Sequence, residues 1–159
     1  MELNITVNGK KLKLDVKPNA SLADVLREAG YKSVHTGCYE GSCGACAVMI
    51  NGRPRNSCII PAGQVEGAEI LTDEGLGNPS EPHVLQKSFV EHGACQCGYC
   101  NPGALISAKA LIDRNTNPTE EDVKDALDGN LCRCTGYVKR IEAILDAAKI
   151  IRKGTKGKK

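Results

Sequence analysis

The spacing of the cysteines constrains this 159-residue chain more than any other feature of its sequence. Eight of the nine cysteines fall into two groups of four. The first group reads C-x4-C-x2-C, with a fourth member after a gap of eleven residues: Cys38, Cys43, Cys46 and Cys58. The second group reads C-x2-C, followed much later by C-x-C: Cys97, Cys100, Cys132 and Cys134. Two thiolate cages leave little room for other chemistry in a chain of this length.

The first group has the spacing of plant-type [2Fe–2S] sites. A two-residue turn at Asn51-Gly52 pairs residues whose numbers sum to 103. Because paired strands lie about 5 Å apart, this register places Cys58 opposite Ala45 and beside Cys46. A zinc site or an inert buried set is the alternative, and the four-residue spacer favours iron. Three glycines favour it too, since they allow positive φ and turn N–H groups toward an anionic cluster: Gly37, Gly41 and Gly44.

The second group is tied to helix starts. Cys100 precedes a helix that begins at Pro102, and Cys134 precedes one that begins near Tyr137. The partial positive charge of a helix N-terminus favours thiolate over thiol. The spacing alone leaves a structural zinc site open. The ninth cysteine, Cys95, is interpreted as a small buried hydrophobic residue, with a redox or ligand role as the alternative.

The expected cellular compartment depends on whether the cysteines bind metal or form disulfides. No secretory apolar segment precedes the first expected strand, and no apolar run is long enough for a bilayer. We therefore expect a cytoplasmic protein without membrane insertion, whose cysteines bind metal instead of forming disulfides. The odd ninth cysteine also argues against two disulfide-linked quartets.

The net charge of +2 comes from the C-terminus. The last eight residues carry five positive charges and no acid, and the rest has 16 basic against 19 acidic residues. We interpret residues 153–159 as a solvated, frayed tail, with a nucleic-acid arm as the alternative. One Phe, four Tyr and no Trp offer few stacking surfaces, so we expect no nucleic-acid partner.

The hydrophobic pattern changes along the chain from a period of two to a period of about 3.6. The first part predicts a hairpin around Asn8-Gly9, a helix from Ser21 to Gly30, a hairpin over 47–60 and a strand at 70–71. The second part predicts helices over 84–89, from Pro102, from Thr119 and over 137–152. We expect an α+β protein with domains at 1–76 and 83–152, joined by a linker at 77–82.

Three segments then resemble the signatures of one family. They read CYEGSCGAC at residues 38–46, QCGYCNPG at residues 96–103 and NLCRCTGY at residues 130–137. In these segments the chain resembles the small iron–sulfur subunit of the molybdenum hydroxylases, such as xanthine dehydrogenase, aldehyde oxidoreductase, carbon monoxide dehydrogenase and nicotinate dehydrogenase. The resemblance fails only in the basic tail, and the joint spacing of eight cysteines makes it specific.

The resemblance implies an N-terminal β-grasp ferredoxin domain and a C-terminal domain like a four-helix bundle, each with one [2Fe–2S] cluster. It implies a large partner subunit with molybdopterin, in its cytosine dinucleotide form, and a medium partner subunit with FAD. The assembly would be a hetero-oligomer such as a dimer of heterotrimers. Gln96 and Cys134 would lie near the pterin. Electrons would run from molybdenum through the helical cluster and the ferredoxin cluster to FAD.

The chain departs from the family pattern beside the second group. Asn101 stands where Thr is usual, and Cys95 stands where a larger apolar residue is usual. Neither is a predicted ligand. We therefore expect these departures to change packing near Gln96 and to leave the electron route intact.

The sequence contains no Gly-rich nucleotide motif, metalloprotease motif or catalytic-triad signature. Because iron–sulfur clusters pass single electrons, the substrate chemistry belongs on a partner, and we expect no catalytic residue here. The predicted function is that of an electron-transfer subunit, with an N-heterocycle such as nicotinate or a purine as the substrate of the whole enzyme. A free-standing two-cluster ferredoxin and a zinc-stapled interaction module are the alternatives.

Overall fold

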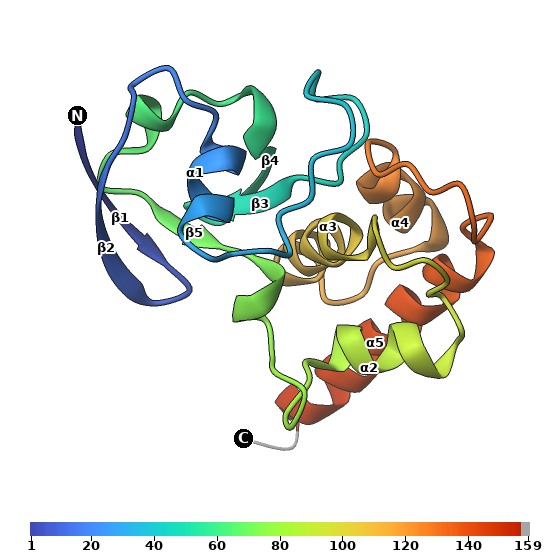
Figure 1. The fold of residues 1–159 in the computed structure, drawn as a ribbon. Helices are drawn as coiled ribbons and strands as arrows, with labels where there is room; N and C mark the ends of the chain where they lie inside the picture. Colours follow the sequence, from blue (N-terminus) through green and yellow to red (C-terminus); the bar gives the residue numbers. More distant parts are fainter. Residues whose placement is uncertain (157–159) are drawn as a thin grey trace.

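Five strands form one mixed sheet in the first half of the chain (Figure 1). The computed structural model describes residues 1–156. Its strands are β1 (Glu2–Val7), β2 (Lys10–Asp15), β3 (Ala47–Ile50), β4 (Arg53–Asn56) and β5 (Glu69–Leu71). They lie in the order β2-β1-β5-β3-β4, with β1 parallel to β5 and the other neighbours antiparallel. Because β5 lies between the two hairpins, it joins them into one sheet.

The two hairpins turn where the sequence predicts. Asn8 and Gly9 have φ values of 51° and 78°, and Asn51 and Gly52 have 49° and 77°. Positive φ at both central residues is the signature of a type I′ turn, which matches the twist of the strands. Asn and Gly adopt this conformation at the least cost among the natural residues.

The register of the second hairpin decides where the fourth cysteine lies. Ala47 pairs with Asn56, so the predicted register is confirmed. The strand itself ends at Asn56, earlier than predicted. Cys58 lies instead in a short 3-10 turn, Ser57–Ile59. The backbone N–H of Ser57 still donates to the carbonyl oxygen of Cys46 at 3.3 Å, so the turn keeps Cys58 beside Cys46.

Helix α1 (Leu22–Glu28) packs on the sheet. It begins after Ser21, where the sequence predicts the helix start, and the Ser21 hydroxyl caps it by accepting a hydrogen bond from the Asp24 N–H at 3.1 Å. Gly30 follows with φ 103° and ends the helix. The apolar face of α1 completes the core of the sheet half, together with strand residues that include Leu3, Ile5, Val7, Val48 and Ile70.

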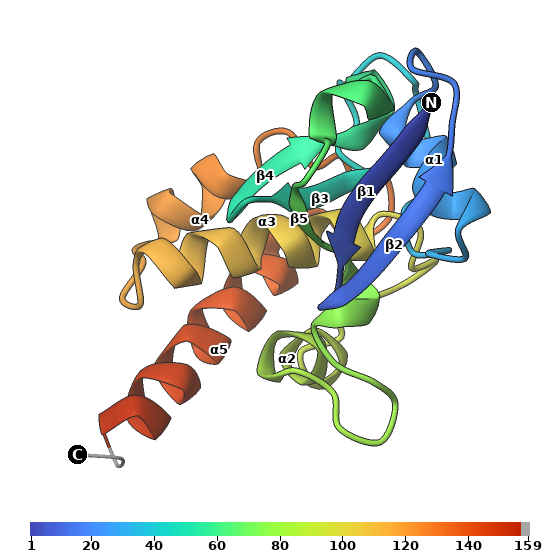
Figure 2. The same ribbon diagram turned by 90° about the vertical axis from the view of Figure 1, so that its left-hand side faces the viewer.

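Four helices follow in the described part of the chain, as predicted (Figure 2). The fourth continues to Lys156, four residues beyond its predicted end, so the first residues of the expected frayed tail are helical. The remaining tail residues, 157–159, lie outside the described residues. The helices are α2 (Val84–Glu91), α3 (Asn101–Arg114), α4 (Glu120–Leu127) and α5 (Val138–Lys156).

Helix α3 lies between the sheet and the other helices (Figures 1 and 2). Its Ile106 is fully buried against Ala47 and Met49 of β3. A separate apolar cluster, which includes Leu85, Phe89, Leu111 and Ile144, forms the core of the helical half. The α+β class is thus confirmed, and the two halves share a packed seam. The limits at 1–76, 77–82 and 83–152 stay predictions.

Among residues 1–156, no helix combines the length and the apolar character that crossing a bilayer requires.

Candidate metal centres

The first four cysteines, called the loop site below, lie on and beside a loop with a backbone N–H group that faces a cysteine sulfur. Gly41 and Gly44 have φ values of 76° and 71°, as predicted. Gly37 has no positive φ, so that part of the prediction is wrong. It lacks a side chain for a different reason, since a Cβ there would lie only 3.1 Å from the Cys43 Sγ. The extra positive φ, 57°, is at Tyr39.

Hydrogen-bond donors of this loop point at the Cys38 sulfur. The Glu40 N–H donates to the Cys38 Sγ at 3.4 Å. The Ser42 side chain, followed by the N–H groups of Glu40 and Cys43, lowers the pKa of Cys38 to about 6. This sulfur is therefore prepared to be a thiolate, the form that ligates iron.

Cys46 and Cys58 lie together in the buried part of the loop site. Burial, and then the neighbouring Cys46 thiol, raise the pKa of Cys58 to about 11. The charge of Cys38 acts in the same direction. Two buried thiolates repel one another unless a cation lies between them. The donor set therefore fits a thiolate-bound metal centre.

The other four cysteines, called the helical site below, have a different environment. Cys100 is the N-cap of α3, and no side chain caps this helix. Burial raises the pKa of Cys100, Arg140 opposes the shift, and the neighbouring Cys132 thiol adds to it. Burial acts on Cys132 in the same way, but hydrogen bonds, chiefly from Thr135, outweigh it and lower the pKa of Cys132 to about 7. The Thr135 N–H donates to the Cys132 Sγ at 3.4 Å.

The remaining two cysteines of the helical site are exposed. Cys97 and Cys134 both reach the surface. Gln96 is exposed as well, and its Nε2 donates to the carbonyl oxygen of Cys134 at 3.0 Å. The structure thus brings together Gln96 and Cys134, the two residues predicted to lie near a pterin.

Within each site, two cysteine thiols lie next to one another. Within residues 1–156, no three His, Cys, Asp or Glu side chains lie close enough to hold one metal ion. A structural zinc ion needs four ligands on one centre, whereas a [2Fe–2S] cluster spreads four thiolates over two irons. The neighbouring thiol pairs Cys46–Cys58 and Cys100–Cys132 match two ligands per iron.

The loop site and the helical site are joined by the backbone. The Leu131 N–H, one residue before Cys132, donates to the carbonyl oxygen of Cys43 at 2.9 Å. The Asn130 side chain donates to the carbonyl oxygen of Gly44 at 3.2 Å. A Cβ on Gly103 in α3 would overlap the same Gly44 oxygen, so only glycine permits this approach. The loops that carry the two cysteine groups are in direct contact.

A second connection runs through an aromatic pair. Tyr99, one residue before Cys100, stacks on His35 with ring centroids 4.5 Å apart. The His35 Nδ1 donates to the Tyr99 carbonyl oxygen at 2.6 Å. The Tyr99 hydroxyl donates to the carbonyl oxygen of Thr36 at 3.0 Å. The stacked pair of His35 and Tyr99 therefore helps to fix one site against the other.

Comparison with known proteins agrees with this geometry. The model of the 2Fe-2S iron-sulfur cluster binding domain matches residues 5–97, and that of the [2Fe-2S] binding domain matches residues 72–145. The small FeS subunit of nicotinate dehydrogenase from Eubacterium barkeri is 49% identical over 138 residues, which cover 86% of this chain and 88% of that subunit. This chain belongs to the small iron–sulfur subunits of the molybdenum hydroxylases.

Two further relatives show the range of this family. The solved quinoline 2-oxidoreductase from Pseudomonas putida 86 matches with a TM-score of 0.92 and 42% identity, over 97% of each chain. Aldehyde oxidoreductase from Megalodesulfovibrio gigas is 46% identical over 151 residues, which cover 92% of this chain but only 17% of that protein. The iron–sulfur subunit described here thus corresponds to a small part of that longer chain.

Arg140 of this iron–sulfur subunit was not singled out in the sequence analysis. Arg140 is 1% exposed, and its Nη2 donates to the Cys100 Sγ at 3.0 Å. The signal was present in the pattern of α5, because Arg140 precedes the buried Ile144, Ala147 and Ala148 at helical spacing. A charged residue at a core position of a helix is rare and needs a partner.

The family departures also meet at this point. The Asn101 Nδ2 donates to the Cys95 Sγ at 2.8 Å, and the Arg140 Nη2 donates to the Asn101 Oδ1 at 2.6 Å. Asn101 and Cys95 are therefore connected, through Arg140, to the predicted ligand Cys100. They affect more than the packing near Gln96 that we expected.

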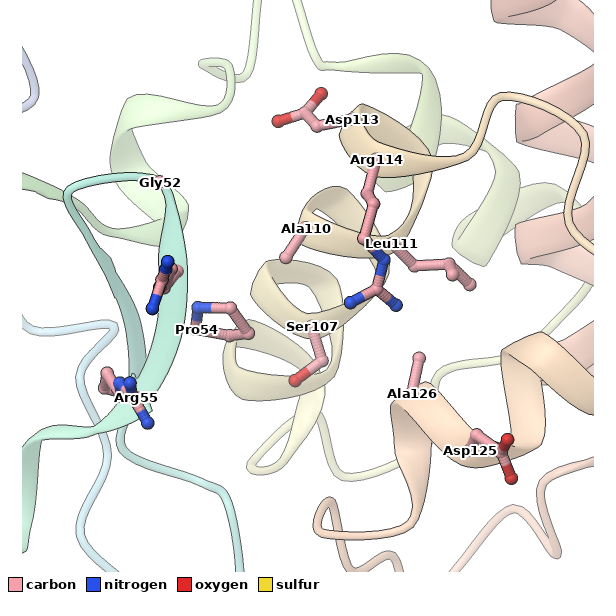
Figure 3. Close-up of a pocket in the computed structure, with 11 residues that line it drawn as sticks. Gly52, Pro54, Arg55, Ser107, Ala110, Leu111, Asp113, Arg114, Asp125 and Ala126 are labelled. Carbon is pink, nitrogen blue, oxygen red and sulfur yellow. The ribbon is translucent and has the colours of Figure 1, made fainter.

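The structure also contains a cavity of about 720 Å³ (Figure 3). The β3–β4 hairpin forms one wall, and helices α3 and α4 form the other. Arg53, Arg55 and Arg114 are among its lining residues, and no cysteine is. This cavity is a hollow in the seam between the two halves of the iron–sulfur subunit and is not part of either site.

Proposed function

We propose that this chain carries electrons one at a time from a molybdopterin centre on a large subunit to FAD on a medium subunit. When bound, a [2Fe–2S] cluster accepts and releases single electrons. The chain itself supplies the thiolates, the hydrogen bonds to sulfur and the connection between two clusters. The ligands would be Cys38, Cys43, Cys46 and Cys58 in the loop site, and Cys97, Cys100, Cys132 and Cys134 in the helical site.

The observation that carries this proposal is the direct contact between the two sites. The Leu131 N–H donates to the Cys43 carbonyl oxygen at 2.9 Å. Cys43 is a proposed ligand of the loop cluster, and Leu131 directly precedes Cys132, a proposed ligand of the helical cluster. The stacked pair of His35 and Tyr99 repeats the arrangement on the Cys100 side. Such contacts keep two redox centres at a fixed separation. A relay requires this, whereas two independent metal staples do not.

The exposed residues suggest how partners would dock. In the helical site Cys134 and Gln96 are exposed together, and Leu131 and Val138 nearby are 55% and 63% exposed. We assign this face to the large subunit and its pterin. Around the loop site, Tyr39 and Ile59 are 54% and 57% exposed. We assign that face to the FAD subunit, since exposed apolar side chains around a site favour a partner surface.

The substrate of the assembled enzyme is proposed to be an N-heterocycle such as nicotinate or a purine. The names of two relatives, nicotinate dehydrogenase and quinoline 2-oxidoreductase, support this class. We further propose molybdopterin in its cytosine dinucleotide form, a dimer of heterotrimers or larger assembly, and domain limits at 1–76 and 83–152.

The test is anaerobic purification of the natively expressed chain with whatever binds it. The expected result is co-purification with a molybdenum subunit and a flavin subunit, together with iron, acid-labile sulfide and two distinct [2Fe–2S] signals in electron paramagnetic resonance (EPR) spectra. Zinc without acid-labile sulfide would contradict the electron-carrier function. A red-brown chain that purifies alone, and that active complexes lack, would point to a free ferredoxin instead.

A further inference from the structure

A buried cation lies against the helical site. Arg140, in the first turn of α5, is 1% exposed, whereas its neighbours Val138 and Lys139 are exposed. Burying an arginine costs several kcal/mol in effect unless a negative charge or a full set of acceptors compensates it. The identity of the compensating group is therefore informative.

The contacts of Arg140 leave one candidate for that group. Its Nη2 donates to the Cys100 Sγ at 3.0 Å and to the Asn101 Oδ1 at 2.6 Å, and its Nε donates to the Ala94 carbonyl oxygen at 3.4 Å. Its guanidinium carbon lies 5.9 Å from the centre of the Phe89 ring. Of these partners, only the sulfur of Cys100 can carry a negative charge.

Two further observations agree with this. None of the ion pairs between described residues includes Arg140. Its Nη1 is buried and has no hydrogen-bond partner within residues 1–156. Buried donors are almost always paired, so this N–H group requires an acceptor that the protein chain does not supply. An anionic cluster bound by Cys100 supplies both the charge and acceptor sulfurs.

We propose that Arg140 is a positioning residue that acts through the Cys100 thiolate and holds the reduction potential of the helical cluster above the value that its cage alone would give. The inference rests on the proposed ligand role of Cys100. One electron enters the cluster on reduction and adds one negative charge, and no proton is transferred. A fixed positive charge at a ligand sulfur stabilises the reduced form more than the oxidised form, because the reduced form is the more negative.

The loop site provides the contrast within the same chain. There the Cys38 Sγ accepts a hydrogen bond from the Glu40 backbone N–H at 3.4 Å, and no Lys or Arg side chain of the described residues donates to a loop-site sulfur. The loop site therefore has a neutral donor where the helical site has a guanidinium. It serves as an internal reference, because a change at Arg140 acts strongly on one cluster and weakly on the other.

The test is an anaerobic redox titration with dithionite as the electron donor, followed by EPR, on the complex that contains this chain. Three variants are compared: Arg140→Met, which removes the charge, Arg140→Lys, which keeps it, and Lys139→Gln, which removes the exposed charge next to it. The signals are assigned beforehand with Cys58→Ala and Cys134→Ala, each expected to remove one of them. Absence of the helical signal from the unmodified protein would refute the proposed function itself.

With both signals present, Arg140→Met is expected to lower the equilibrium constant for reducing the helical cluster by at least about tenfold, which is ~59 mV for one electron. Arg140→Lys should recover at least half of that shift, and Lys139→Gln should leave both clusters near their original potentials. Loss of the helical cluster in Arg140→Met but not in Arg140→Lys would also support the charge requirement. A change below about threefold in Arg140→Met, or loss of the cluster in both Arg140 variants, would overturn the inference in favour of a packing role.

Discussion

The two cysteine sites of this chain place their sulfurs in contrasting environments. In the loop site, Cys46 and Cys58 are buried, and neutral donors surround the sulfur of Cys38. In the helical site, Cys97 and Cys134 are exposed, and the half-buried Cys100 faces a guanidinium. The loop site is enclosed mainly by its own loop. The helical site is open to solvent at Cys97 and Cys134 and faces the charged Arg140 at Cys100.

This difference suggests a division of labour. A cage tuned by backbone N–H groups depends on one short segment, since its donors come from the same loop as its ligands. A cage built from two helix starts depends on tertiary packing and on a partner that covers its open side. The loop site should therefore be the more autonomous of the two, and the helical site the more sensitive to remote substitutions.

The largest expected effect comes from removing one ligand of each cage. Cys58→Ala should abolish the loop-site EPR signal, and Cys134→Ala the helical-site signal, each with loss of half of the bound iron, because a cage with three thiolates cannot hold both irons. Iron analysis and EPR measure both. Cys95→Ala is the matched control and should keep all the iron. If Cys58→Ala also removed the helical signal, the sites would not assemble separately and the comparison would fail.

The next effect concerns the contact that holds the two sites together. Gly103→Ala should shift the urea midpoint downward, because its Cβ would meet the Gly44 carbonyl oxygen, and overpacking of this kind costs ~1–3 kcal/mol. Helix propensity acts the other way, by up to ~1 kcal/mol. Gly154→Ala isolates that contribution, since nothing lies within 4 Å of its position on α5, and it should be neutral or stabilising. Equal behaviour of the two variants would mean that the halves do not pack closely at Gly44.

Sequence reasoning predicted the local parts of this molecule well. The Asn-Gly turns, the Ser21 cap and the starts of α3 and α4 were found because each depends on a few adjacent residues with a known preference. The register that carries Cys58 back to Cys46 followed from the turn at Asn51-Gly52 alone. Residue propensities predict a structure correctly where it depends on interactions between neighbouring residues of the chain.

The contacts between segments distant in the chain were not predictable in this way. The bond from Leu131 to Cys43 spans most of the chain length, and no periodicity encodes it. Arg140 looked like one more polar residue of a surface helix until its burial was known. The proximity of Gln96 and Cys134 was expected only from the family resemblance, and their hydrogen bond places them together in this chain.

A smaller effect is expected from the open face of the helical site. Gln96→Ala removes the hydrogen bond to the Cys134 carbonyl oxygen, which contributes ~0.5–1.5 kcal/mol. Both EPR signals and the iron content should stay unchanged, while electron delivery from molybdenum slows by up to about tenfold. Stopped-flow reduction of the complex measures that rate. Gln64→Ala, another exposed glutamine, is the control, and equal rates for the two variants would remove Gln96 from the partner face.

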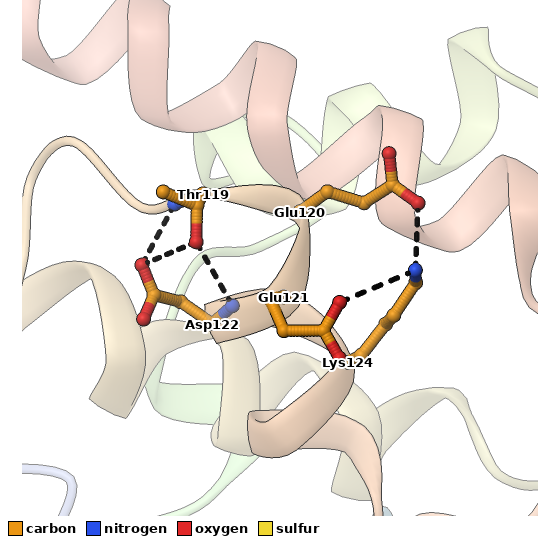
Figure 4. A network of polar contacts seen from close by, with 5 residues as sticks. All are labelled: Thr119, Glu120, Glu121, Asp122 and Lys124. Carbon is orange, nitrogen blue, oxygen red and sulfur yellow. Dashed lines mark hydrogen bonds and ion pairs between the residues drawn. The ribbon is translucent and has the colours of Figure 1, made fainter.

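The smallest effect tests why one helix start is capped and another is not. Helix α4 begins with a complete capping box, in which the Thr119 hydroxyl accepts from the Asp122 N–H at 3.2 Å while the Asp122 carboxylate accepts from the Thr119 N–H at 2.8 Å (Figure 4). Lys124 pairs with Glu120 on the same helix. Helix α3, by contrast, begins at Cys100 with no side-chain cap. We attribute this difference to the roles of the two helix starts. The N-terminus of α3 carries the proposed cluster ligand Cys100, whereas the capped N-terminus of α4 contributes only to the stability of the fold.

Thr119→Ala should therefore lower the protection of α4 amides against hydrogen exchange by ~1 kcal/mol and leave both EPR signals unchanged. Hydrogen bonds from the Thr119 backbone and side chain hold the pKa of Asp122 below its ordinary value. A lowered pKa in the folded state stabilises the fold above the ordinary carboxyl pKa, and this stabilisation is lost only as the pH falls through the lowered value. The effect of Thr119→Ala should thus be constant from neutral to mildly acidic pH, a range in which the clusters survive. A change in either cluster signal would show that α4 supports the helical site, and the contrast with α3 would then be lost.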